Sequence, residues 1–92
     1  MKAIWNNEII ADSRDTLVIE GNHYFPQDTV NLEYLISNDN CVECPWKGLA
    51  KYYSLKVDGK NNPNAAWFYP NPKEAVLITG YIAFRNDIQI TE

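Results

Sequence analysis

The segment 49–57, followed directly by Asp58-Gly59, constrains the fold more than any other feature of this chain. In a β-strand, successive side chains point to opposite faces, so Tyr53 and Leu55 share one apolar face while Tyr52 lies on the other. Asp-Gly is a strong tight-turn signal. The segment therefore predicts a strand that enters a hairpin, with Tyr53 in the core and Tyr52 facing a pocket.

The rest of the chain consists of short apolar or aromatic runs separated by turn residues. Asn6-Asn7 and Asn86-Asp87 each predict a hairpin turn, the second one joining the last two strands. Segments 37–40 and 61–64 are rich in Asn, so we expect them to be loops. Further strands are expected at 3–5, 9–11, 17–19, 23–25, 65–69, 81–84 and 88–90.

Segment 28–37 fits two patterns. Leu32 and Leu35 have helical spacing, whereas Val30 and Leu32 also fit a strand, so both interpretations stay open. Either way, we expect a single all-β domain over residues 1–92. It should consist of about eight short antiparallel strands with at most one short helical turn.

The charge pattern excludes some classes of partner. The chain has 12 acidic and 8 basic residues, a net charge of −4, and its bases are scattered from Lys2 to Arg85. A nucleic-acid binder needs a concentrated basic face, so no nucleic-acid partner is expected. No apolar run approaches the roughly 20 residues of a membrane helix, and the first residues do not resemble a signal peptide. We expect a cytoplasmic protein without a membrane partner.

Cys41 and Cys44 have the spacing of one half of a structural zinc site. Such a site needs four ligands, usually from two such pairs, and here the second pair is missing. His23 is the one histidine of the chain. We therefore predict no metal site and no cofactor. A reactive thiol, with Cys44 as a catalytic candidate, and ordinary packing of Cys44 both remain as alternatives, as does a metal completed by carboxylates.

Lys47 lies between Trp46 and Gly48, just before the predicted strand. An ammonium group beside aromatic rings can hold an anion, or its pKa can fall; alternatively, the stem of a surface lysine lies across the tryptophan. Lys47 is therefore a predicted binding residue and a catalytic candidate. The predicted ligand-binding residues would form an aromatic-walled cleft with one cation. They are Trp46, Lys47, Tyr52, Trp67, Tyr69 and Tyr81.

Four blocks of the sequence, together with its opening segment 9–13, carry a family resemblance. They are His23-Tyr24-Phe25-Pro26; Cys44-Pro45-Trp46-Lys47-Gly48 with Ala50, Tyr52, Tyr53 and Ser54; residues 65–70 with Pro72; and residues 78–84. In this order they resemble DUF427, a family of small bacterial and fungal domains, over essentially the whole chain. The resemblance implies an Mss4-like or β-tent fold, in which sheets lean together around a cleft.

The resemblance implies less about activity. The family is one of unknown function and is sometimes labelled nucleotidyltransferase-like, but this chain has neither paired acids at a metal-binding spacing nor a phosphate loop. Related folds include methionine sulfoxide reductases B and zinc proteins with two C-x-x-C pairs. This chain has one pair, and Cys44 is the thiol inside the family block.

Three functions follow as hypotheses. The first is a module that binds a small planar or anionic ligand. The second is a small enzyme that uses Lys47 or Cys44 as nucleophile or acid–base group. The third is a homodimer that pairs through the edge of the terminal strand, residues 88–91.

Overall fold

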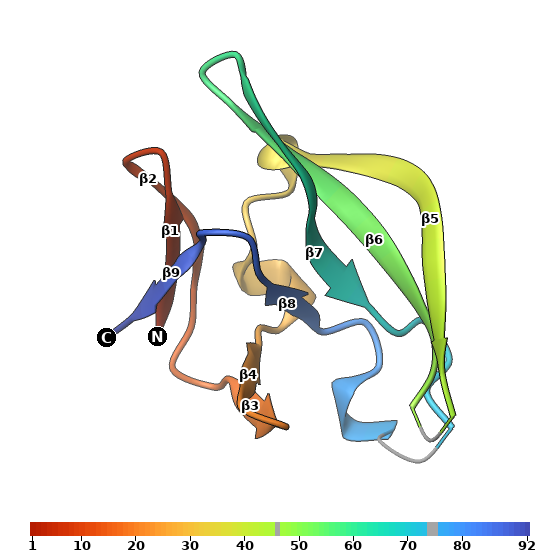
Figure 1. Ribbon diagram of the computed structural model, residues 1–92. Coiled ribbons are helices and arrows are strands. Elements are labelled where there is room, and N and C mark those ends of the chain that lie inside the picture. The colour runs from red at the N-terminus through yellow and green to blue at the C-terminus, as the bar shows by residue number, and fades with distance from the viewer. Residues whose placement is uncertain (46, 74–75) are drawn as a thin grey trace.

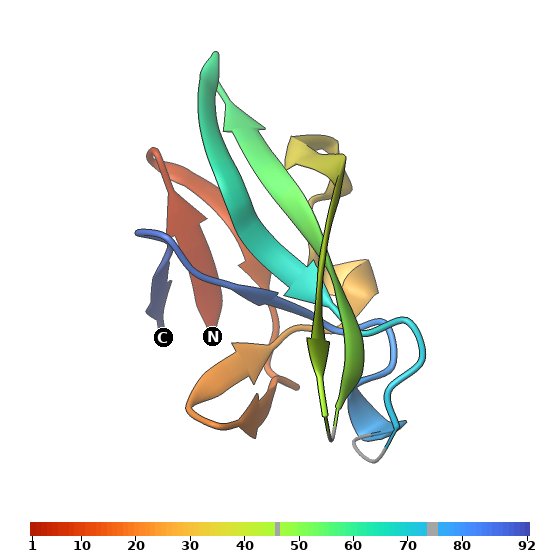
Figure 2. The same cartoon turned by 45° about the vertical axis from the view of Figure 1, so that its right-hand side comes forward.

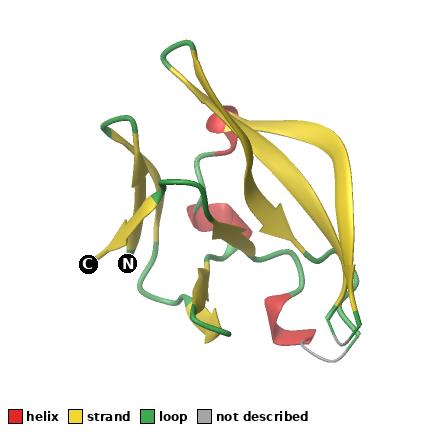
Figure 3. Cartoon of the chain, in the orientation of Figure 1, coloured by secondary structure: helices red, strands yellow, loops and turns green. Residues whose placement is uncertain are grey.

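The computed structural model describes residues 1–45, 47–73 and 76–92. Over these residues the chain forms nine short strands and single turns of 3₁₀ helix, with no α-helix (Figures 1 and 3). The all-β prediction is confirmed. The strands are β1 (Lys2–Trp5), β2 (Glu8–Asp12), β3 (Leu17–Ile19), β4 (Asn22–Tyr24), β5 (Leu35–Cys44), β6 (Gly48–Val57), β7 (Lys60–Phe68), β8 (Ile82–Phe84) and β9 (Gln89–Thr91).

The 3₁₀ turns account for the ambiguous segment. It contains η1 (Gln27–Thr29) and η2 (Leu32–Tyr34), after which β5 begins. A third turn, η3 (Val76–Ile78), precedes β8, so three helical turns are described where at most one was expected. Each turn is too short to use a full helical stripe, which explains why the apolar residues match neither period well.

The first sheet has the strand order β2-β1-β9 and contains both termini (Figure 1). The predicted hairpin between β1 and β2 is confirmed, and both residues of its turn have positive φ, 51° at Asn6 and 64° at Asn7. Asparagine tolerates this conformation better than most residues. The predicted hairpin between the last two strands is wrong. β9 pairs with β1, and β8 pairs with β7 in another sheet, although Asn86 and Asp87 do have the positive φ of a turn.

The largest sheet has the order β5-β6-β7-β8 (Figure 2). The strand predicted over residues 49–57 is confirmed as β6, and Asp58-Gly59 forms its turn to β7. The loops predicted at 37–40 and 61–64 are wrong, because both segments lie inside strands.

Two irregularities explain how these polar segments fit into strands. In β5, residues 38–40 lie opposite Tyr52 alone, and Figure 1 shows β5 curving away from β6 there. In β7, residues 63–65 lie opposite Ser54 alone. Such bulges bend a strand and leave its residues without ladder partners.

Asparagine side chains connect the two bulges. The Asn38 Nδ2 donates to Ser54 Oγ (3.1 Å) and Asn64 Oδ1 (3.0 Å), and Asn40 Nδ2 donates to the same Asn64 oxygen (2.9 Å). Further along β7, Asn62 is buried and its Nδ2 donates to the Asn86 carbonyl oxygen at 2.7 Å. Asparagines that usually favour loops are therefore satisfied here by side-chain hydrogen bonds between strands.

The two-stranded sheet β3-β4 lies beside β8. Phe25, directly after β4, exchanges two backbone hydrogen bonds with Ile82 of β8, both 2.8 Å long. Within the hairpin, His23 Nδ1 lies 3.3 Å from the Thr16 hydroxyl oxygen. The base of this hairpin is thus joined to the large sheet, whereas its turn, Glu20-Gly21, is exposed.

The interior is divided into two clusters. The first lies between the β2-β1-β9 sheet and the large sheet, and its buried residues include Phe25, Leu55 and Phe84. The second lies between the opposite face of the large sheet, the β3-β4 hairpin and η3. Tyr53 packs against the first cluster and Tyr52 against the second, so the predicted division of these two tyrosines between faces matches the structure.

Candidate functional site

The second cluster gathers the sequence-predicted site residues that the structure describes. Tyr69 is one of its buried residues, and several half-buried side chains pack against it, namely Cys44, Tyr52, Trp67 and Tyr81. The Lys47 ammonium lies 5.4 Å from the centre of the Tyr69 ring. Trp46 lies outside the described residues. We call Tyr24, Lys47, Tyr52, Trp67, Tyr69 and Tyr81 the aromatic–lysine cluster.

The backbone of Lys47 is fixed by the loop after β7. The Lys73 amide donates to the Lys47 carbonyl oxygen at 3.0 Å. The next residue, Gly48, has φ +103°, and a Cβ atom there would lie 3.2 Å from the Asn71 carbonyl oxygen. Glycine is therefore required by both conformation and space. This arrangement sets the direction in which Lys47 leaves the β5–β6 turn.

The Lys47 side chain is buried and ion-paired. Lys47 as a whole residue is 5% exposed. Its Nζ lies 2.9 Å from Oε1 of Glu20, which is in the β3–β4 turn. The two side chains differ in exposure, 7% for Lys47 and 54% for Glu20. Lysine is rarely buried to this extent without a partner. Glu20 is not among the predicted site residues, because no local pattern indicates a contact between a hairpin turn and a distant lysine.

The surroundings of Lys47 favour its charged form. Burial lowers the pKa of Lys47, but the hydrogen bond to Glu20 and the electrostatic effects of Tyr24, Tyr69 and Glu20 together raise the pKa above its usual value of 10.5. Lys47 is therefore an ammonium group at neutral pH, suited to holding an anion and not to nucleophilic attack. Burial has the opposite effect on Tyr69 and raises its pKa, although Lys47 partly offsets this, so Tyr69 stays protonated.

The aromatic rings form a continuous row. The ring of buried Tyr24 meets Trp67 edge to face at 6.2 Å, and Trp67 Nε1 donates to the Tyr24 hydroxyl at 3.3 Å. Trp67 in turn lies 6.5 Å from Tyr52, and the exposed Arg85 guanidinium lies 4.9 Å from the Tyr52 ring centre. Arg85 therefore places a cation at the Tyr52 end of the row, while Lys47 lies against Tyr69 in the same cluster. Tyr24 and Arg85 were not predicted as site residues, although Tyr24 belongs to one block of the family resemblance.

The two thiols do not form a joint site. Both are free; Cys41 is exposed, whereas Cys44 is half-buried against the second cluster. They lie on one extended strand at an odd spacing, so their side chains point to opposite faces. Among the described residues, no three His, Cys, Asp or Glu side chains are grouped as metal ligands.

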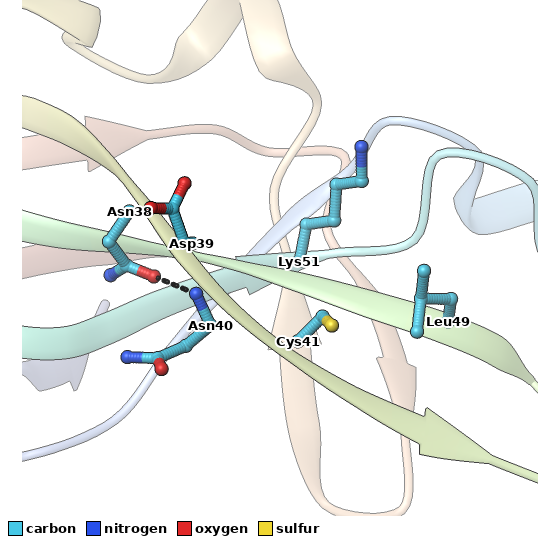
Figure 4. A pocket seen from close by; sticks show the side chains of 6 residues that line it. All are labelled: Asn38, Asp39, Asn40, Cys41, Leu49 and Lys51. Carbon is cyan, nitrogen blue, oxygen red and sulfur yellow. Dashed lines mark hydrogen bonds between the residues drawn. The ribbon is translucent and has the colours of Figure 1, made fainter.

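A hollow of about 200 Å³ lies on the β5–β6 hairpin, next to the β5 bulge (Figure 4). Asn38 Oδ1 accepts a hydrogen bond from the Asn40 amide at its rim, 2.9 Å long. The lining residues are Asn38, Asp39, Asn40, Cys41, Leu49 and Lys51. None of the predicted ligand-binding residues that the structure describes lines this hollow.

Comparisons with known proteins place the chain in a family. No curated protein matches it. The described residues contain no helix that is long and apolar enough to cross a membrane. The sequence model of one family, described as a domain of unknown function (DUF427), matches residues 1–91 of the 92-residue chain. This protein therefore belongs to the DUF427 family.

Proposed function

We propose that this protein is a binding module for a small anionic ligand with a planar part, and that the aromatic–lysine cluster is its binding site. The observation that carries the proposal is the buried Lys47 ammonium, which lies among tyrosine rings and holds a carboxylate. Aromatic walls with a few placed polar groups are typical of small-molecule sites.

Burial of a charge supports a functional role. Moving an ammonium group out of water is costly, and the exposed Glu20 offsets only part of this cost. Leucine or methionine at position 47 would therefore pack the second cluster without this cost. We infer that the lysine serves ligand recognition, with the half-buried Trp67 and Tyr52 as the aromatic wall for a planar group.

The enzyme hypothesis is weaker for Lys47 than for Cys44. A raised pKa keeps the Lys47 proton in place, which opposes its use as a nucleophile or general base. Cys44 remains the candidate nucleophile. Alkylation of the native protein with iodoacetamide tests this role. If Cys44 reacts no faster than an exposed model thiol, Cys44 is not an activated nucleophile.

Thermal shift with planar acids tests the binding proposal. Suitable probes are aromatic carboxylates and nucleoside monophosphates, each with a neutral analogue. We expect some anionic probes to raise the melting temperature of the wild type and of Lys51→Met, but not of Lys47→Met. Lys51 is the matched control, because it is an exposed lysine on β6, the strand that follows Lys47. Equal shifts in all three proteins would exclude the Lys47 site.

A homodimer is the second candidate, and one observation favours it. β9 is an outer strand of its sheet, so one backbone edge has no partner strand among the described residues. Edges of this kind pair with other chains. Light scattering of the wild type and Thr91→Lys tests the idea, and a monomer at millimolar concentration would contradict it.

Two finer assignments belong with these proposals. We propose that the three sheets form a Mss4-like or β-tent arrangement, with a ligand cleft at the aromatic–lysine cluster; an experimental structure superposed on that fold class would test this. We also propose that the protein acts in the cytoplasm, where the free Cys41 and Cys44 would stay reduced. Cell fractionation with thiol labelling would check it.

A further inference from the structure

We propose that Glu20 occupies the place of the ligand's carboxylate in the ligand-free protein, and that the ligand is therefore a planar carboxylic acid whose binding displaces Glu20. This inference rests on the proposed function. It adds the chemical class of the ligand and a residue that sets affinity.

The Lys47–Glu20 ion pair joins a fixed group to an exposed one. Lys47 is held by the Lys73 amide and by the close approach of Gly48 to Asn71. Its side chain is 7% exposed, whereas that of Glu20 is 54% exposed. If the pair separates, Glu20 can therefore be solvated by water at once, whereas the Lys47 ammonium would stay buried beside Tyr69 and would favour another anion in the place of Glu20.

The turn that carries Glu20 borders solvent. Glu20 and Gly21 are exposed, and a Cβ atom added to Gly21 would meet nothing within 4 Å. Tyr24, at the other end of β4, is fully buried and anchors the hairpin base. A movement limited to the turn would separate Glu20 from Lys47 and leave the second cluster packed.

The chemistry of the pair indicates the ligand class. A glutamate side chain presents a carboxylate to Lys47 through one oxygen at 2.9 Å, with the Tyr69 ring against the same ammonium. A small carboxylic acid can reproduce this contact atom for atom. Its ring would extend along the half-buried Trp67 and Tyr52 side chains.

Replacing Glu20 with Gln tests the proposal. The probes are benzoate, indole-3-carboxylate, phenyl phosphate and the neutral benzamide, titrated by calorimetry or ¹⁵N NMR. We expect the two carboxylates to bind Glu20→Gln about 1.4- to 5-fold more tightly than the wild type, because an exposed competing ion pair contributes about 0.2–1 kcal/mol. Benzamide should bind neither protein.

The matched control is Glu33→Gln, which removes the same charge from an exposed position on η2. It should leave carboxylate affinity at the wild-type value. An equal gain in Glu33→Gln would mean that net charge, not displacement, is responsible, and would overturn the inference. So would phenyl phosphate gaining affinity in Glu20→Gln while benzoate does not.

Failure of this inference can be distinguished from failure of the proposed function. If carboxylates bind the wild type but not Lys47→Met, and Glu20→Gln binds no more tightly, the displacement role of Glu20 is wrong while the site stands. If carboxylates bind Glu20→Gln alone, the inference is supported. If neither protein binds any probe, both proposals are wrong for this ligand class.

Discussion

The two clusters of this small domain differ in what they bury. The first contains aliphatic and phenylalanine side chains, such as Leu55 and the edge-to-face pair Phe25 and Phe84. The second contains buried Tyr24 and Tyr69, with the Lys47 ammonium beside them. Both clusters pack against the same sheet, on opposite faces.

The difference separates stability from recognition. Apolar burial stabilises the fold by roughly 25 cal/mol per Å², and the first cluster provides it without polar groups that need partners. The second cluster combines apolar burial with an ammonium, phenol hydroxyls and an indole N–H, each of which requires a specific partner. Its composition suits a site, so substitutions in the two clusters should have different consequences.

The largest expected effect is on stability in the first cluster. Leu55 is fully buried, so Leu55→Ala removes buried methyl groups and leaves a cavity. We expect the free energy of unfolding to fall by about 2–5 kcal/mol. Urea denaturation measures this, with binding of any identified ligand unchanged under folding conditions. A loss below about 1 kcal/mol would contradict the division of roles between the clusters.

A smaller loss is expected where the chain enters the second cluster. Gly48→Ala places a Cβ atom 3.2 Å from the Asn71 carbonyl oxygen in a residue with φ +103°. We expect a loss of about 1–3 kcal/mol in unfolding free energy, because the new residue strains the backbone. Gly59→Ala is the matched control, since it shares a positive φ of 79° but its Cβ atom would meet nothing within 4 Å. Equal losses would show that crowding against Asn71 is unimportant.

Local patterns predicted those features whose causes are local. The alternation over residues 49–57 and the Asp58-Gly59 turn led directly to β6 and its hairpin, and asparagine turns behaved as expected near Asn6. Among the described residues, four of the predicted aromatic residues, Tyr52, Trp67, Tyr69 and Tyr81, pack in one cluster, with Lys47 beside Tyr69. Tyr52 and Tyr53 could be assigned to different clusters because they lie on opposite faces of β6.

The features that were missed depend on contacts between distant residues. The Asn-rich segments form strands because side chains on β5 and β7 bond to each other. The last strand pairs with the first because both cover the first cluster, which a local turn signal cannot indicate. Glu20 was missed for the same reason, since its importance comes entirely from Lys47.

A smaller effect is expected in the pH dependence of stability, which should reflect the ionisable groups of the second cluster. The folded-state pKa of Lys47 is raised above 10.5, so its contribution is fully present below that pH and is lost as pH rises through the folded-state pKa. The raised pKa of Tyr69 acts in the same direction above 10.0. We expect Lys47→Met to lose less stability than the wild type between about pH 9.5 and 11.5. The difference should be below about 1 kcal/mol, because Glu20 is exposed to solvent.

Urea denaturation at each pH measures this difference. Lys51→Met is again the control, and it should follow the wild type. A steeper alkaline loss in Lys47→Met than in the wild type would contradict the stabilising role of the lysine proton.

The smallest effect is expected at Cys41, outside both clusters. Its side chain is exposed on β5, so Cys41→Ser should change the unfolding free energy by less than about 0.5 kcal/mol. In the native wild type, a thiol reagent should modify Cys41 before the half-buried Cys44. Mass spectrometry of the partly labelled protein identifies the order, and earlier labelling of Cys44 would contradict this expectation and favour Cys44 as a reactive thiol.

The most direct test of the central claim is the melting temperature of the wild type and Lys47→Met, measured side by side with benzoate and indole-3-carboxylate. We expect the acids to stabilise the wild type in a concentration-dependent way, as binding to the folded state requires, and to leave Lys47→Met unchanged. Equal stabilisation of both proteins, or none of the wild type and of Glu20→Gln, would contradict it.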